Sequence, residues 1–167
     1  NAGGTTQFLG ANTAGSTSLT VNNGGFLNFL DSSTAASASI VTRAGGQTSF
    51  IDSSSAGSAT LKTTGSNAFT FFQDNSTAGN SIITVSATAT VQFLQSGSAG
   101  TASITADNGG VSFFLCGGGG KPACPAATSG SVTGTVAPTD VLGPTAQNFV
   151  AGQPLTIYML NVAYYNT

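Results

Sequence analysis

The sequence predicts an all-β protein: a parallel β-helix (β-solenoid) of about 21 residues per coil, with a small antiparallel β-sandwich-like segment at the C-terminal end. The first observation is a phrase, Phe-Ile-Asp-Ser-Ser-Ser-Ala-Gly-Ser-Ala-Thr-Leu at 50–61, whose phenylalanine recurs at spacings of 21, 21, 22, 21 and 21 residues. A period of this size is typical of a solenoid. The second is a composition dominated by Gly, Ser, Thr, Ala and Asn, which is a mixture that forms helices poorly. The recurring residues, which we expect to form a core stack, are Phe8, Phe29, Phe50, Phe72, Phe93 and Phe114.

Residues 1–115 form the repeat array, and each coil reads as two or three short strands joined by turns. Counting from the phenylalanine as position zero, small residues recur at plus nine and Leu or Ile at plus eleven, as in Ala59 and Leu61. Position minus two and the phenylalanine at position zero are also two residues apart, as in Thr48 and Phe50, so they would face inward together. This period of two predicts strands with one face inward. Glycine pairs such as Gly45-Gly46 mark the turns.

Stacked coils would pair each strand in parallel and in register with its copy, about 4.8 Å away, in a rod of roughly 25 Å. The connections are too short for helical crossovers, which need a dozen or more residues. The alternatives are an antiparallel sandwich of short strands and disorder. Identical inward residues at constant offsets favour parallel stacking over both.

Composition excludes several function classes. Charged residues are 5% of the chain and the net charge is −2, which argues against a nucleic-acid partner. No apolar run approaches the roughly 20 residues of a membrane helix, so we expect no membrane insertion. The chain starts at Asn1 rather than Met, which fits a processed protein or a fragment.

Residues 116–130 read as a Gly/Pro-rich linker in which the repeat stops. Cys116 and Cys124 flank Gly-Gly-Gly-Gly-Lys-Pro-Ala. The chain has no histidine and no second cysteine pair for a zinc site. The short spacing favours a disulfide-closed loop over free thiols, and a disulfide would imply an oxidising compartment.

The array resembles the β-strand repeat regions of large bacterial autotransporter passengers. The matching phrase is Phe-x-x-x-x-Ser/Thr-Ala-Gly-x-Ala-x-Leu/Ile, followed by Gly-Gly, and it covers about two thirds of the chain. The resemblance implies an extracellular or cell-surface location and a role in adhesion, display or surface coating.

Residues 131–167 resemble part of a chordin-type (CHRD) domain. The similar stretches are Ser-Val-Thr-Gly-Thr-Val-Ala-Pro-Thr-Asp-Val-Leu-Gly-Pro-Thr-Ala-Gln at 131–147 and Leu-Asn-Val-Ala-Tyr-Tyr-Asn-Thr at 160–167. The His-Thr and Gly-Glu-Ile-Arg-Gly elements of that family are absent. The resemblance implies a β-sandwich-like module, often secreted, with no catalytic set to carry over.

Two rows of polar residues are candidate sites. Asp31, Asp52 and Asp74 recur at plus two and would form a carboxylate ladder. We expect them to cap backbone N–H groups in turns. The alternatives are a calcium site, the one cofactor left open, and a retaining glycosidase pair about 5 Å apart. A hydroxyl row at plus five would bond to turn backbone, or serve O-glycosylation, glycan adhesion or ice binding; its members are Thr13, Thr34, Ser55, Thr77 and Ser98.

We therefore expect a non-enzymatic extracellular structural protein, a rod or filament subunit of a surface appendage, coat or matrix. Gly3-Gly4 before Phe8 matches Gly24-Gly25 before Phe29, so the chain opens within a repeat without a polar cap. An uncapped coil predicts a homo-oligomer joined head to tail, through the open solenoid end and the C-terminal segment. A fragment of a longer passenger would look the same. The functional alternatives are an adhesin that binds glycan or a host surface, an ice-binding protein and a polysaccharide-active enzyme.

Overall fold

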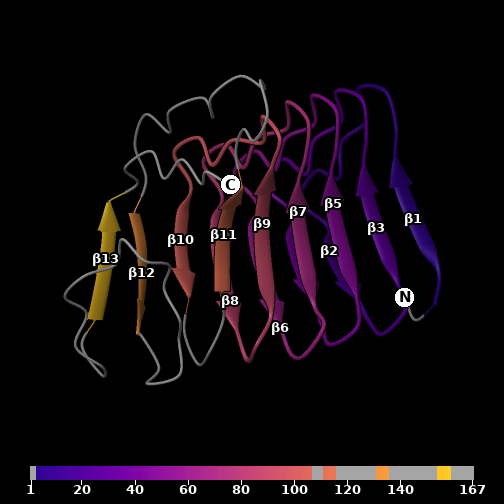
Figure 1. Ribbon diagram of the computed structural model, residues 1–167. Coiled ribbons are helices and arrows are strands. Elements are labelled where there is room, and N and C mark those ends of the chain that lie inside the picture. The colour runs from indigo at the N-terminus through magenta and orange to yellow at the C-terminus, as the bar shows by residue number, and fades with distance from the viewer. Residues whose placement is uncertain (1–2, 107–110, 116–130, 136–153, 159–167) are drawn as a thin grey trace, which may run out of the picture.

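The computed structural model describes residues 3–106, 111–115, 131–135 and 154–158, all in strands, turns and bends. Figure 1 shows two sheets of strands lying along one axis, from β1 at one end to β13 at the other. The protein is a β-solenoid of stacked coils of about 21 residues, as predicted from the repeat.

Each coil contributes one strand to each sheet. The first sheet has the order β1 (Thr5–Phe8), β3 (Phe26–Phe29), β5 (Gln47–Phe50), β7 (Phe69–Phe72), β9 (Thr90–Leu94) and β11 (Val111–Leu115). The second sheet has the order β2 (Ser18–Val21), β4 (Ser39–Thr42), β6 (Thr60–Thr64), β8 (Ile82–Ser86), β10 (Ser103–Ala106), β12 (Ser131–Thr135) and β13 (Pro154–Tyr158). Apart from β12 with β13, the pairings are parallel.

A third, narrower ladder closes the cross-section. It consists of single-residue parallel bridges that link the hydroxyl row at plus five from one coil to the next. Each coil therefore has three sides, joined by tight turns such as Ser33 N–H to Leu30 C=O, Ala38 N–H to Ala35 C=O and Gly46 N–H to Arg43 C=O.

The phenylalanines at position zero stack along the inside of the first sheet. Ring centroids of successive residues from Phe8 to Phe93 lie 4.7, 4.7, 4.8 and 4.8 Å apart, with planes within 6° of parallel. These separations equal the spacing of neighbouring strands, so one stacking step matches one coil. The predicted core stack is confirmed for these five residues. For Phe114 the structure gives the strand pairing with Phe93, and its side chain lies outside the described part.

The other inward positions form parallel columns of matched size. The alanines at plus six and the Leu or Ile residues at plus eleven are buried beside the phenylalanine stack, except that Leu19 in the first coil is partly exposed. Leu27, Thr48 and Val91 face inward at minus two, as the alternation predicted. The fully buried alanines and aliphatic residues between 35 and 104 include Ala35, Ala56, Ala78, Ile40, Ile83 and Ile104.

The 22-residue coil keeps this register because its extra residue lies in a turn. Thr63 and Thr70 meet across the coil and are seven residues apart in sequence, whereas the matching pair Thr42 and Thr48 is six residues apart. The longer turn between them contains Gly65 and Asn67, both with positive φ. The strands on both sides therefore stay aligned with their neighbours.

The C-terminal strands extend the second sheet. Ser131 of β12 pairs in parallel with Ser103 of β10, and β13 pairs antiparallel with β12. The proposed linker 116–130, the predicted disulfide between Cys116 and Cys124, and the rest of the CHRD-like segment lie outside the described residues.

Replacing the central stacked ring should be among the most destabilising single changes. We expect Phe50→Ala to lower the free energy of unfolding by about 3–5 kcal/mol, because a fully buried ring is removed from between two neighbours. Phe8→Ala is the matched control: that ring is partly buried and stacks on one described side. Denaturant unfolding of both variants tests this, and equal losses would contradict the inward stack.

The buried threonine pairs allow a test of whether the two hydroxyls of a pair depend on each other. Thr42 Oγ1 and Thr48 Oγ1 lie 2.7 Å apart, while the equivalent places two coils later hold Val85 and Val91. We expect Thr48→Val alone to cost about 1–3 kcal/mol, because the Thr42 hydroxyl stays buried without its partner. The double variant with Thr42→Val should be nearly neutral. A double-mutant cycle by denaturant unfolding measures the coupling; additive losses would refute it.

Candidate functional site

The aspartate row lies at the turn that follows each strand of the first sheet. Asp31, Asp52 and Asp74 have φ values of 56°, 59° and 55°. The left-handed region is costly for most residues, and Asp or Asn enters it more readily than others. Gly10 and Gln95 occupy the same corner in the flanking coils, with φ values of 63° and 57°. The left-handed conformation of the turn therefore favours residues such as Asp and Gly at this corner.

Each carboxylate in the row accepts a hydrogen bond from the coil before it. Oδ2 of Asp31 accepts the Gly10 N–H at 2.8 Å, and Oδ2 of Asp52 accepts the Asp31 N–H at 3.1 Å. The contact from the Asp52 N–H to Oδ2 of Asp74 is longer, at 3.5 Å. Gln95 replaces the carboxylate with its Oε1, which accepts the Asp74 N–H at 2.8 Å. These are the backbone-capping bonds expected of turn aspartates.

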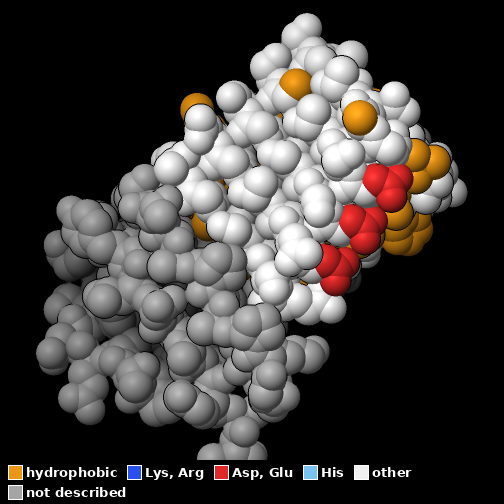
Figure 2. Space-filling view, turned by 90° about the horizontal axis from the view of Figure 1, so that it is seen from above, with side chains coloured by type: hydrophobic (Ala, Val, Ile, Leu, Met, Phe, Trp, Pro, Cys, Tyr) orange, Lys and Arg blue, Asp and Glu red, His pale blue; other side chains and the backbone are white. Residues whose placement is uncertain are grey.

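The row forms a ridge with its charges in water. Figure 2 shows the three carboxylates side by side along one corner, next to hydrophobic side chains. Asp31 and Asp52 are exposed and Asp74 is half-buried. Arg43 follows β4 in a different turn, and Lys62 faces outward from the second sheet. In the part of the chain that the structure describes, no three His, Cys, Asp or Glu residues come together to hold a metal ion. The calcium and glycosidase interpretations of the row stay untested predictions.

The hydroxyl row also serves the backbone. In each coil the Oγ atom at plus five accepts the N–H of the residue two positions later, at 3.0 to 3.1 Å. That later residue has positive φ in every coil, as in Ala36 at 52° and Gly57 at 63°. The hydroxyl stabilises this left-handed turn, which is the turn role expected for Ser and Thr.

A column of serines next to this row was not anticipated. Ser33, Ser54 and Ser76 are fully buried, and within the described residues their Oγ atoms have no hydrogen-bond partner. Gly97 holds the same position in the next coil, and a Cβ added there would lie 2.3 Å from the Phe72 carbonyl oxygen. The corner therefore accepts only small side chains. Its sequence signal is the small residue that follows the aspartate by two positions.

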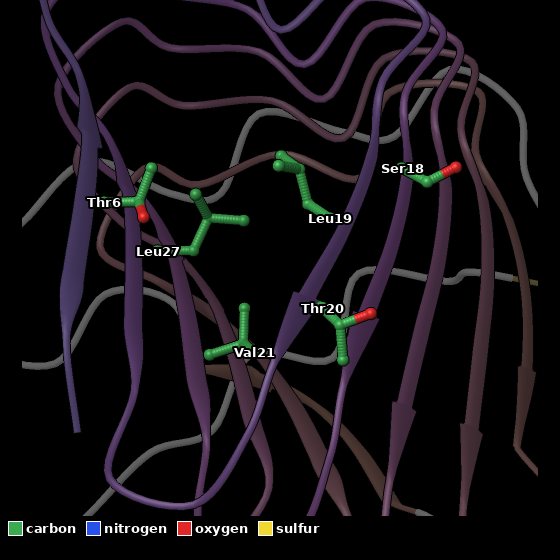
Figure 3. Close-up of a pocket in the computed structure, with 6 residues that line it drawn as sticks. All are labelled: Thr6, Ser18, Leu19, Thr20, Val21 and Leu27. Atoms are coloured by element: carbon green, nitrogen blue, oxygen red, sulfur yellow. The ribbon is translucent and has the colours of Figure 1, made fainter. Parts of the chain in front are cut away.

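The first coil presents a hollow between the two sheets. The hollow has a volume of about 210 Å³ and is lined by Thr6, Ser18, Leu19, Thr20, Val21 and Leu27. Figure 3 shows Leu19, Val21 and Leu27 pointing into the space between the sheets, with Ser18 and Thr20 pointing away from it. None of the aspartates belongs to it. The hollow lies at the first coil's end of the core columns, and its polar lining residues are hydroxyl residues, with no carboxylate, histidine, cysteine or lysine among them.

Sequence reasoning also missed the outer face of the first sheet. Phe26 is 42% exposed, and Phe69 and Phe71 are half-buried with ring centroids 5.6 Å apart. The signal was present as Phe-x-Phe at minus three and minus one, positions that point outward when position zero points inward.

Compared with protein-family models, curated proteins and solved structures, the chain matches none of them. Within the described ranges there is no helix of the length and apolar character that a membrane span requires.

The aspartate row should respond to substitution as a turn element. Asp52→Ala should cost about 1–2 kcal/mol, because alanine is disfavoured in the left-handed region and provides no acceptor for the Asp31 N–H. Asp52→Asn should cost less, since it keeps both properties. Thermal melts in calcium and in chelator should coincide for all three proteins. A calcium-dependent rise in melting temperature that Asp52→Asn abolishes would instead assign a metal site.

Proposed function

We propose that the protein is a non-enzymatic, extracellular structural protein, a rod subunit that adds further coils end to end in a surface appendage, coat or matrix. The observation that carries the proposal is the match between successive coils. Each coil repeats the column positions of the one before it, at one ring-stacking step of 4.7–4.8 Å. The surface at the end of the rod therefore complements another coil of the same pattern.

The first coil has the features of a stacking surface. β1 and β2 are the outermost strands of their sheets, and an outermost strand is a template for another strand. Between them lies the hollow, into which Leu19, Val21 and Leu27 point. At the opposite edges are β11 and β13. In the proposed head-to-tail contact, β11 and β13 of one copy approach β1 and β2 of the next.

The extracellular location belongs to the same proposal. It is supported by the spacing of Cys116 and Cys124, which suits a disulfide, and by the resemblance to autotransporter passengers. The hydroxyl and carboxylate rows support a non-enzymatic role, because their oxygen atoms bond to the turns of the solenoid itself.

Blocking one edge strand should stop end-to-end growth. The carbonyls of Thr17 and Val21 bond to residues of the neighbouring coil, so the N–H of Ser18, one position out of phase, points to the open side. Ser18→Pro removes that N–H and places a ring there. We expect the unchanged chain to lengthen with concentration in light scattering and to form filaments in electron microscopy. Ser18→Pro should weaken this by about tenfold or more.

Ser18→Ala is the control, because it removes the hydroxyl and keeps the N–H, so it should still assemble. Equal assembly by all three proteins, or an unchanged chain that stays monomeric at every concentration, would refute the end contact. Saturable glycan binding by that monomer would favour the adhesin alternative.

A further inference from the structure

The outer face of the first sheet differs in character from the rest of the surface. We define this face as the outward residues at minus three, minus one and plus one of each coil, which lie in β1, β3, β5, β7 and β9 or directly after them. Apolar side chains occupy about half of these positions, including Phe26, Leu30, Ile51, Phe69, Phe71 and Leu94. They range from half-buried to 49% exposed in Leu9, the plus-one residue of the first coil. Apolar side chains gathered on one exposed face are a feature of interaction sites.

The apolar residues alternate with uncharged polar ones. Amide side chains lie among them, as in Asn28, Gln73 and Gln92, and the Gln47 Nε2 donates to Ser49 Oγ at 3.0 Å. Amides both donate and accept hydrogen bonds, so they can pair with copies of themselves. Stacked aromatic rings and amide ladders are also what packed, identical sheets use at their contacts.

The absence of charged residues makes this face compatible with contact to a second copy. None of its residues between 5 and 94 is charged. The described charges lie elsewhere: the aspartates in the turn beyond the face, Arg43 in the turn after β4, and Lys62 on the second sheet. Two such faces could therefore meet without burying a charge of the face itself, which would cost several kcal/mol.

The outer face of the second sheet provides the contrast. Its outward positions hold mainly hydroxyl residues, such as the exposed Ser39, Thr60 and Ser103, together with Lys62. Ile82, 57% exposed, and the half-buried Val41 are the apolar residues among the described outward positions of this sheet. The two outer faces of the rod therefore differ: the second sheet presents a mainly polar face, and the first sheet presents an uncharged, partly apolar face.

We propose that the outer face of the first sheet is a lateral contact with a second copy of this chain, first sheet against first sheet. The same patch would serve both partners, as in an isologous dimer. Packed sheets lie about 10 Å apart, which leaves room for the phenylalanine and amide side chains to interdigitate. The proposal needs no end-to-end contact and can hold where that contact fails.

The size of the face sets the strength of the contact. Five strands at about 4.8 Å, with three outward positions each, span roughly 400 Å². A standard interface buries about 800 Å² per partner, so a single pair of chains should associate weakly. Rods that grow end to end would lengthen the face, and many weak contacts in one pair of rods then act together.

The test uses the Ser18→Pro chain, because its altered strand is on the other sheet and its end contact is blocked. Sedimentation equilibrium should detect a weak monomer–dimer equilibrium in this chain. Adding Phe69→Thr with Phe71→Gln should raise the dimer dissociation constant by about tenfold or more. That variant copies Thr90 and Gln92, the residues at these positions in the next coil, so it should fold. A second variant, Phe71→Lys, should abolish the dimer through like-charge repulsion.

Ile82→Lys is the matched control: it removes an exposed apolar residue from the opposite face and should change the constant by less than about twofold. The dimer should also be insensitive to salt, because no charges meet in it. The proposal is overturned if the Ser18→Pro chain stays monomeric or if salt dissociates the dimer. It is also overturned if Ile82→Lys weakens the dimer as much as the Phe69/Phe71 variant does. Glycan binding lost in Phe71→Lys, without a dimer, would reassign the face to carbohydrate.

Discussion

The spacing between coils is the constraint on which the rest of this structure depends. Parallel strands hydrogen-bond at about 4.8 Å, and the phenylalanine rings repeat at 4.7–4.8 Å. At this distance inward side chains stack on their counterparts in the coils before and after them, and the phenylalanine, plus-six alanine and Leu/Ile columns each keep one residue size. Where one member of a pair becomes polar, its partner across the coil does too, as with Thr42 and Thr48 against Val85 and Val91. The extra residue of the 22-residue coil is admitted only in a turn.

The same constraint explains the polar rows that look like sites. Three tight turns per coil need left-handed residues, and backbone N–H groups at these turns need acceptors. The Asp52 carboxylate caps the N–H of Asp31 in the preceding coil, and the Ser55 hydroxyl caps that of Gly57 two residues on. A repeated aspartate or serine is thus first a consequence of repeated turns. Side chains that serve the backbone in every coil give no reason to expect a reaction there.

The two proposed contacts use different surfaces of the solenoid. A hollow lies beside β1 and β2, and the first sheet carries an uncharged outer face. In the proposals, each surface would meet a second copy of the chain, because the repeat gives successive coils the same pattern. End-to-end addition and lateral pairing are separate proposals, since they involve different residues. Together they would give bundled rods in which the polar outer faces of the second sheets point to solvent.

Much of the fold was readable from the sequence alone, because one period governs spacing, turns and inward residues together. The constant offsets of Phe29, Ala35 and Ile40 from coil to coil predicted parallel stacking and the core columns, and the structure confirms both. Tertiary structure decided what periodicity cannot encode. That the carboxylate of Asp52 bonds to the coil before it depends on how coils are offset. β12 joins the second sheet although its sequence lies outside the repeat pattern. Thr63 meets Thr70 because the extra residue of that coil lies in the turn between them.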